Sequence, residues 1–303
     1  MSAQIKTVRR FTQRYKNYSF SELMNKADEE FLELVVEMDS TGNILMESKF
    51  DNEGELEERN SYTYSALGKL EEHVLLYAID DVTERRALKR NEKGHLLEEI
   101  KYYGDDSGEK IEYSYDGKEN ISEIKRFDEE GDFDSKEEMK YDESGSLIER
   151  IRTDKNGAVI ERLTFLQNSD SNEIEELEFH PDGKVKSKTV VRLNEKGKEV
   201  SSVQTTPDGK LIAAITTAYD ERGNVLERHY KDFYSKSMRY TYDEQDRMLT
   251  QELFDGSGML LKKNIYEYDE AGNIITEQTF EIDTSRGGRD KHFGTRYEYE
   301  FYG

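Results

Sequence analysis

The chain has 303 residues, a net charge of −23 and no cysteine, which excludes disulfides, thiolate metal ligands and thiol nucleophiles. Only 34% of the residues are hydrophobic and 37% are charged, too little apolar material for a two-layer sandwich of this length. No apolar run is long enough for a transmembrane helix, and no secretory-type apolar segment opens the chain. We therefore expect a cytoplasmic protein without membrane insertion, although export by a route that needs no such segment stays open.

The first 18 residues differ from the rest because they carry five basic and no acidic side chains. A basic arm on an acidic body can bind nucleic acid, an anionic surface or a protein partner. It can also lie on the protein's own acidic sheet. We favour the last interpretation and do not expect nucleic acid as a partner, because the net negative charge repels polyanions at long range. The basic residues of the arm are Lys6, Arg9, Arg10, Arg14 and Lys16.

Ser19 and Glu22 have the spacing of a capping box, which predicts a short helix from about Phe20 to about Asp28. Such a helix would cover the open first edge of a β-sheet, whose backbone groups are otherwise unpaired. The chain is accordingly divided into a basic arm with a capping helix, residues 1–30, and a continuous array of β-hairpin repeats, residues 31–303.

A short turn signal recurs along the array, and its clearest copy is Tyr268-Asp269-Glu270-Ala271-Gly272-Asn273. The Asp269 carboxylate can accept a backbone N–H two residues further on. Gly272 falls where a hairpin turn with a bulge requires positive φ. These roles are structural, and we assign the turn carboxylates no catalytic or metal-binding function. Similar turns begin at Phe50, Phe127, Tyr141, Tyr219 and Phe254.

Successive turns are separated alternately by about 12 and 14 residues, so that a unit of about 26 residues contains two strands and two turns. This period predicts an all-β fold: a long antiparallel meander of about 20 strands, largely a single layer. At a strand spacing of about 4.8 Å the sheet would extend for roughly 95 Å. Sheets of that length twist, so we expect a curled or superhelical ribbon.

Pairs of tyrosines with the pattern Tyr-x-Tyr close many of the units. Side chains two residues apart lie on one face of a strand, so in register these pairs would form an aromatic ladder near one end of the sheet. Cross-strand aromatic contacts could hold a thin sheet together. The functional alternative is a binding surface for sugar rings or for an extended partner chain. The pairs are Tyr62 and Tyr64, Tyr113 and Tyr115, Tyr240 and Tyr242, Tyr266 and Tyr268, and Tyr297 and Tyr299.

The segments YDERGNVLERHY, YDEAGNIITEQTF and FDEEGDFDSKEEMKYDESGSLIER resemble the YD-repeat (Rhs-like) proteins, whose repeats centre on Tyr-Asp-x-x-Gly-x-Leu. The resemblance covers roughly residues 36–282. It implies hairpins that form a spiralling sheet, often a shell around a toxin or part of a cell-surface protein. This chain is far smaller than such a shell and has no toxin or protease segment at its C-terminus, so we do not expect it to enclose a toxin domain.

The sequence gives little evidence of catalysis. Its five histidines, His73, His95, His180, His229 and His292, do not pair at metal-ligand spacing, and we expect no metal and no cofactor. We therefore predict a non-enzymatic binding or scaffold protein that presents a long curved β-sheet to a protein partner. One alternative is a carbohydrate-binding repeat protein that uses the tyrosine ladder. Another is a hydrolase whose site lies in irregular loops near residues 73–90 or 284–292.

Overall fold

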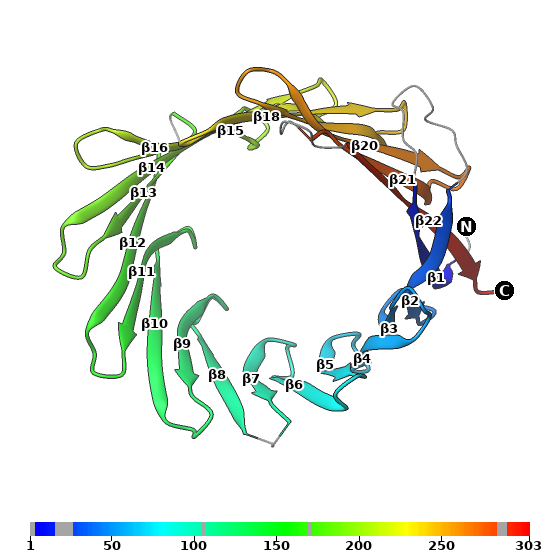
Figure 1. The fold of residues 1–303 in the computed structure, drawn as a ribbon. Helices are drawn as coiled ribbons and strands as arrows, with labels where there is room; N and C mark the ends of the chain where they lie inside the picture. Colours follow the sequence, from blue (N-terminus) through cyan, green and yellow to red (C-terminus); the bar gives the residue numbers. More distant parts are fainter. Residues whose placement is uncertain (1–3, 16–26, 105–106, 169–170, 284–289) are drawn as a thin grey trace.

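In a computed structural model the chain forms one antiparallel sheet of 22 strands, which closes into a barrel because β1 pairs with both β2 and β22. Figure 1 shows the resulting ring, with the two chain ends side by side at the seam. The structure describes residues 4–15, 27–104, 107–168, 171–283 and 290–303. No helix in these ranges is long and apolar enough to cross a membrane.

The first eleven strands run from the seam around one half of the ring. They are β1 (Ile5–Arg14), β2 (Glu29–Met38), β3 (Ile44–Phe50), β4 (Leu56–Tyr64), β5 (Leu70–Tyr77), β6 (Val82–Arg90), β7 (Leu96–Tyr102), β8 (Gly108–Tyr115), β9 (Ile121–Phe127), β10 (Phe133–Tyr141) and β11 (Leu147–Asp154).

The other eleven strands complete the ring and return to β1. They are β12 (Val159–Asn168), β13 (Glu173–Phe179), β14 (Val185–Leu193), β15 (Glu199–Thr205), β16 (Leu211–Tyr219), β17 (Val225–Lys231), β18 (Ser235–Tyr242), β19 (Met248–Asp255), β20 (Leu260–Tyr268), β21 (Ile274–Glu281) and β22 (Lys291–Phe301).

Most hairpins turn in the way that the repeated sequence signal predicts. In the copy at β20 and β21, the N–H of Gly272 donates to the carbonyl of Asp269 over 3.1 Å, and the N–H of Asp269 donates to the carbonyl of Asn273 over 2.9 Å. Gly272 has a φ of 91°, and the strand register shifts between Glu267 and Tyr268. The turn therefore ends in a bulge, which adds local twist to each strand pair.

The prediction of an all-β antiparallel meander is confirmed, but the prediction of an open curled or superhelical ribbon is wrong. The reason is β1, whose residues were assigned to a basic arm and instead form the strand that joins the two ends of the sheet. Among the described residues the sheet then has no open edge for a helix to cover, since every described strand has two neighbours. Of the predicted helix, residues 20–26 lie outside the described residues, and Asp28 leads directly into β2 without helical structure.

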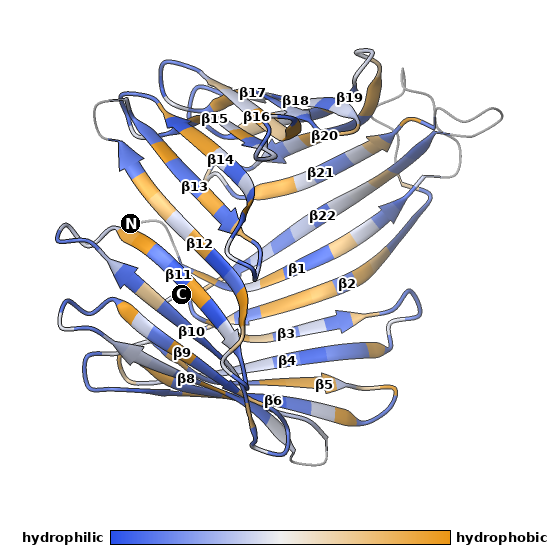
Figure 2. Ribbon diagram, turned by 90° about the vertical axis from the view of Figure 1, so that its left-hand side faces the viewer, coloured by the Kyte–Doolittle hydropathy of each residue, from blue (hydrophilic) through white to orange (hydrophobic). Residues whose placement is uncertain are grey.

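The barrel wall is one layer thick, and very few side chains in it are fully buried. Within the described ranges the buried apolar residues are Val36, Leu163 and Phe280. Figure 2 shows hydrophilic and hydrophobic residues interspersed along the strands. Stability in such a wall depends on cross-strand pairs and on hydrogen bonds more than on a dry core.

Charged side chains occur in mid-strand on both faces of the wall. Glu149 and Arg150 are neighbours in β11 and therefore point to opposite faces. The Glu149 carboxylate is paired with Arg162 at 2.8 Å, and Arg150 is paired with Glu161 at 3.2 Å. Each face of the sheet thus carries its own ion pairs.

Candidate binding rim

One end of the barrel carries the turns that follow the even-numbered strands, and most of the Tyr-Asp signals lie there. We call this end the tyrosine rim and the other end the opposite rim. An antiparallel meander places alternate turns at alternate ends, so the two turn types that differ in sequence are separated in space. The tyrosine rim contains the turns at residues 39–43, 65–69, 91–95, 116–120, 142–146, 194–198, 220–224, 243–247 and 269–273.

The aspartates of these turns hold the turns together. In the first of them, Asp39 Oδ1 accepts the N–H of Thr41 at 2.8 Å and the N–H of Asn43 at 3.0 Å, and the Asn43 amide donates to Oδ2 at 2.9 Å. These hydrogen bonds, foremost those from the Thr41 and Asn43 side chains, lower the pKa of Asp39 strongly. Among the described residues no group of three or more His, Asp or Glu side chains could hold a metal ion.

The second tyrosine of most Tyr-x-Tyr pairs donates a hydrogen bond from its hydroxyl to a main-chain carbonyl of the preceding strand. The hydroxyl of Tyr268 donates to the carbonyl of Met248, the first residue of β19, over 2.7 Å. In β6, where Arg90 stands in place of the tyrosine, its guanidinium donates to the equivalent carbonyl of Leu70 at 3.4 Å. The same bond is made by Tyr64, Tyr115, Tyr141, Tyr219, Tyr242 and Tyr299.

The first tyrosine of each pair is half-buried. Its direct partner on the adjacent strand is not a tyrosine. Tyr62 stacks on His73 with ring centroids 4.8 Å apart, and its hydroxyl donates to Glu47 at 2.5 Å. Burial and this carboxylate raise the pKa of Tyr62. The remaining cross-strand partners are Ile124 for Tyr113, Gln251 for Tyr240, Glu277 for Tyr266 and Arg10 for Tyr297. The tyrosine pairs thus lie at one rim, but the strands between them carry other side chains at the same level, so the pairs do not form a continuous aromatic ladder.

Basic side chains connect neighbouring turns of the tyrosine rim, which the sequence reasoning missed. Lys118 donates to the carbonyl of Glu143 at 2.6 Å, and Arg247 donates to the carbonyl of Asp269 at 3.3 Å. Each such residue lies about one unit before its acceptor. A signal was present in the sequence, because a lysine or arginine recurs directly after the glycine position of several turns, at Lys69, Lys198 and Arg247.

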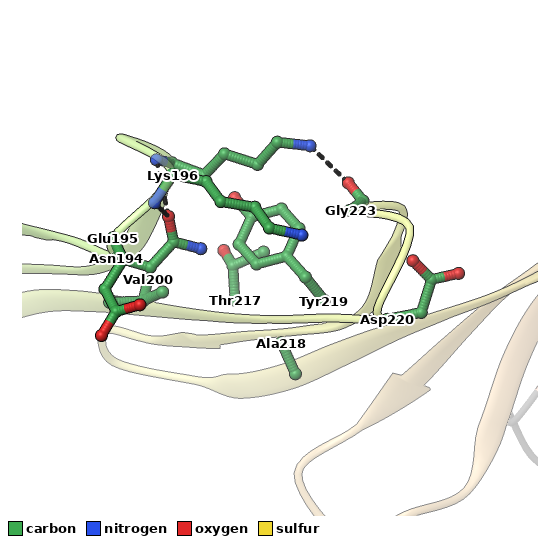
Figure 3. Close-up of a pocket in the computed structure, with 10 residues that line it drawn as sticks. Asn194, Glu195, Lys196, Val200, Thr217, Ala218, Tyr219, Asp220 and Gly223 are labelled. Carbon is green, nitrogen blue, oxygen red and sulfur yellow. Dashed lines mark hydrogen bonds between the residues drawn. The ribbon is translucent and has the colours of Figure 1, made fainter.

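An open pocket of about 520 Å³ lies between the turns at residues 194–198 and 220–224. Figure 3 shows Tyr219 and Thr217 on the side of the sheet to which Lys196 extends, with Ala218 on the other side. Lys196 donates to the carbonyl of Glu221 at 3.0 Å, and Lys198 donates to that of Gly223 at 2.5 Å. The Lys198 ammonium also lies 5.3 Å from the centre of the Tyr219 ring. The pocket therefore combines an aromatic floor with two cationic groups.

Two further pockets lie on the same rim. One, of about 680 Å³, lies between the turns at residues 39–43 and 65–69 and is lined by Tyr62, Tyr64 and Leu67. The other, of about 560 Å³, lies at the seam, where Ile5 and Phe301 from the chain ends meet Met38 and Ala271. Open recesses thus lie between turns at three places on the rim.

The basic residues near the N-terminus are engaged within the barrel. Lys6 is paired with Glu300 of β22 at 2.8 Å, Arg10 with Glu33 of β2 at 3.1 Å, and Arg14 with Glu29 at 4.0 Å. Arg9 also lies near Glu300, at 3.7 Å. Lys16 lies outside the described residues. The sequence placed these residues in an arm on the surface of the acidic sheet, whereas they form strand β1 of the sheet and pair with acids of its two neighbouring strands.

In the part of the chain that the structure describes, the histidines lie at separate places in the barrel. His73 contacts Asn60 at 2.7 Å in β4. His292 is stacked between Tyr15 and Phe280 at the seam, with centroid distances of 3.8 and 4.2 Å. Residues 73–90 belong largely to β5 and β6, which are joined by a short turn. Residues 284–289 of the other predicted loop lie outside the described part of the chain.

These features define a closed antiparallel barrel with recesses on one rim. No model of a known protein family and no curated protein matches the chain. Among solved structures, a porin-like protein from Bacteroides uniformis is similar over 98% of both chains, with 11% identity and a TM-score of 0.31. A porin-like protein from Bacteroides vulgatus covers 89% of this chain and 100% of its own, with 12% identity and a TM-score of 0.25.

A complex named TcdB2-TccC3 is also similar, with 13% identity and a TM-score of 0.22, over 90% of this chain and 23% of the other. All of these likenesses are too weak to carry an argument about function.

Proposed function

We propose that the protein is a non-enzymatic binding or scaffold protein that offers its tyrosine rim to a protein partner. The observation that carries the proposal is the pair of open pockets between rim turns that are lined by tyrosines, one of which also contains the exposed apolar side chain of Leu67. Aromatic residues are enriched at the centres of protein interfaces, where they supply contact area and a polar tip.

The hydrogen bonds of the rim support recognition over catalysis. Turn carboxylates such as Asp39 and Asp269 accept the N–H groups of their own turns, and rim hydroxyls such as that of Tyr268 donate to main-chain carbonyls. An acid–base catalyst needs a titratable group within reach of a reacting atom and a pKa near the working pH. The turn aspartates have instead a lowered pKa, because the turn stabilises the charged form.

The carbohydrate alternative has less support from the geometry. A sugar-binding ladder needs aromatic faces at regular spacing, whereas the cross-strand partners of the first tyrosines are residues of other kinds, such as Ile124, Gln251 and Glu277. The relation to the YD-repeat proteins is likewise part of the proposal, because it rests on the repeated turn and on the bonds of its Tyr and Asp.

We also propose an aqueous, cytoplasmic location. The support comes from ion pairs on both faces of the wall, such as Glu149 with Arg162 on one face and Arg150 with Glu161 on the other. Half-exposed charges of this kind are stable where water contacts both faces.

A photo-crosslinking amino acid at Leu67 tests the rim directly, because this side chain is 73% exposed within a rim pocket. In a native lysate we expect one discrete crosslinked product, which excess unlabelled protein competes away. A matched position is Thr216, which is exposed in the middle of β16. The same product from Thr216, or no competed product from Leu67, would contradict the proposal.

A further inference from the structure

The most exposed large apolar side chains in the described part of the chain lie on the opposite rim, away from the proposed binding pockets. The hairpin tip between β17 and β18 presents Phe233, which is 99% exposed, and Tyr234, which is 83% exposed. The tip is ordered by its own bonds, since the N–H of Tyr234 donates to Asp232 Oδ1 over 2.8 Å. A Cβ on Gly256 would lie 3.1 Å from the carbonyl oxygen of Ser235, so this hairpin packs closely against the next.

The two neighbouring hairpins of this rim also expose apolar side chains, to a smaller extent of 38–45%. The hairpin of β15 and β16 exposes Leu211 and Ile212, and the hairpin of β19 and β20 exposes Met259. Successive tips on one rim are two strands apart, about 9.6 Å from the strand spacing. The exposed apolar side chains are therefore distributed over three hairpins, with polar residues between them. A single pocket in a partner protein would accommodate the side chains of one hairpin, whereas the surface of a lipid bilayer can accommodate those of all three.

Lysines surround these tips without ion-pair partners in the described part of the chain. They are Lys210, Lys231 and Lys236, whereas strand lysines elsewhere, such as Lys188 and Lys263, are paired with glutamates. Asp208, Asp232 and Asp255, the acids of the same tips, accept hydrogen bonds within their own turns. The three lysines and the three aspartates of these hairpins together have no net formal charge.

Three other tips of the opposite rim contrast with this sector, whereas the tips at residues 154–158 and 180–184 also carry a lysine. The tips at residues 51–55, 78–81 and 128–132 carry acidic residues and no lysine or arginine. One sector of the rim can therefore approach an anionic surface while the acidic sector is repelled from it. Aromatic side chains beside lysines suit the boundary between lipid headgroups and acyl chains, where the ring is buried and the ammonium stays in water.

We propose that this sector, residues 208–212, 231–236 and 255–259, is a peripheral docking surface for lipid membranes that contain anionic headgroups. Phe233 enters the interface as the principal anchor, Tyr234 and Met259 contact it beside the anchor, and the three lysines face the phosphate groups. The contact is peripheral and leaves the tyrosine rim free at the other end of the barrel.

The chain contains no tryptophan, so a Phe233→Trp variant carries a single fluorescent reporter at the tip. With vesicles of phosphatidylcholine and phosphatidylglycerol we expect its emission to shift to shorter wavelength, and to shift less with phosphatidylcholine alone. The control is Ile79→Trp, because Ile79 is 82% exposed on the same rim but lies beside Asp80 and Asp81. Its emission should stay unchanged.

Vesicle co-sedimentation completes the test with the full-length protein. The double variant Phe233→Ala/Tyr234→Ala should lose sedimentation with vesicles, and the variant Lys210→Gln/Lys231→Gln/Lys236→Gln should lose the preference for phosphatidylglycerol. An unchanged emission of Phe233→Trp with both vesicle types overturns the proposal, and a shift caused only by a protein fraction assigns the surface to a protein partner. An equal shift of Ile79→Trp also overturns it, because the contact would not be specific to this sector.

Discussion

The hydroxyl of Tyr302 donates a hydrogen bond of 2.6 Å to the carbonyl oxygen of Met38, so the last residues of the chain are joined to the end of β2 across the closing strand β1. The bond resembles the one that rim tyrosines make between adjacent strands, but it spans the seam. The N–H of Tyr302 donates in addition to the carbonyl of Gln4 at 2.9 Å. The seam is therefore held by a hydrogen bond from a tyrosine hydroxyl to a main-chain carbonyl, as the repeats are.

An engineered disulfide across the seam tests closure of the barrel. Thr12 of β1 pairs with Thr295 of β22. Directly paired antiparallel residues have Cα atoms about 4.5–5.5 Å apart, within the range that a disulfide spans. Because the native chain has no cysteine, Thr12→Cys/Thr295→Cys contains only these two thiols. We expect the oxidised protein to migrate faster on a non-reducing gel and to unfold at a higher urea concentration.

The control for this prediction is Thr12→Cys/Thr216→Cys, which places the second thiol on the distant strand β16. It should stay reduced under the same conditions. Equal disulfide formation in the two variants, or none in Thr12→Cys/Thr295→Cys, would show that the chain ends do not meet as described.

Removal of one rim hydroxyl should weaken the fold measurably. Tyr268→Phe deletes the bond to the carbonyl of Met248 and keeps the ring. We expect the free energy of unfolding to fall by about 1 kcal/mol, since a carbonyl loses its donor. Tyr234→Phe is the matched control because that residue is 83% exposed, and it should leave the urea midpoint unchanged. Equal effects of the two substitutions would refute the structural role of the rim hydroxyls.

The turn glycines of the tyrosine rim differ in how strongly their backbone conformation favours glycine. Gly272 has a φ of 91°, whereas Gly117, on the same rim, has no positive φ and open space around it. Gly272→Ala should lower the free energy of unfolding by about 1–2 kcal/mol, because a Cβ disfavours the left-handed region. Gly117→Ala should be neutral or slightly stabilising, since alanine restricts the unfolded chain. Urea unfolding of both variants distinguishes the two cases, and the reverse order would contradict the assigned turn geometry.

The sequence predicted the turns, because Asp269 and Gly272 act through local bonds that a hexapeptide already specifies. It did not predict closure, which depends on small increments of twist summed over all strands. Residues 5–14 were judged by their charge, although Ile5, Thr7, Val8, Phe11 and Thr12 favour a strand. Their basic side chains match the acids of β2 and of β22. The match with β22 joins residues as far apart as Lys6 and Glu300, which are 294 positions apart, and no local pattern shows it.

The candidate rim was predictable only in part. The tyrosine pairs were found by their spacing, and the structure places them at one end of the barrel. The pocket between the turns at residues 194–198 and 220–224 depends on how far its lysines reach toward the next unit, as Lys198 does toward Gly223. Side-chain reach across two strands follows from the curvature of the sheet and therefore could not be inferred from periodicity. The exposed tip at Phe233 interrupts the repeated turn signal, and sequence reasoning gave it no role.

The seam should lose stability in mild acid through His292. Its ring is buried between Tyr15 and Phe280, and Phe280 is only 1% exposed. Burial lowers the pKa of His292 below its usual value of about 6.5, because desolvation disfavours the charged ring. The unfolded chain thus takes up a proton at higher pH than the folded one. The contribution to stability is complete above pH about 6.5 and decreases as the pH falls toward the lowered pKa.

This prediction is checked by urea unfolding at a series of pH values between about 5 and 8, the range where a histidine titrates. His292→Gln removes the titrating ring, so the variant should be less stable than the wild type at neutral pH, and the difference should shrink as the pH falls. His180→Gln, at an exposed turn of the opposite rim, serves as the control and should leave the pH profile unchanged. A constant difference between His292→Gln and the wild type across this range would show that His292 does not couple the seam to pH.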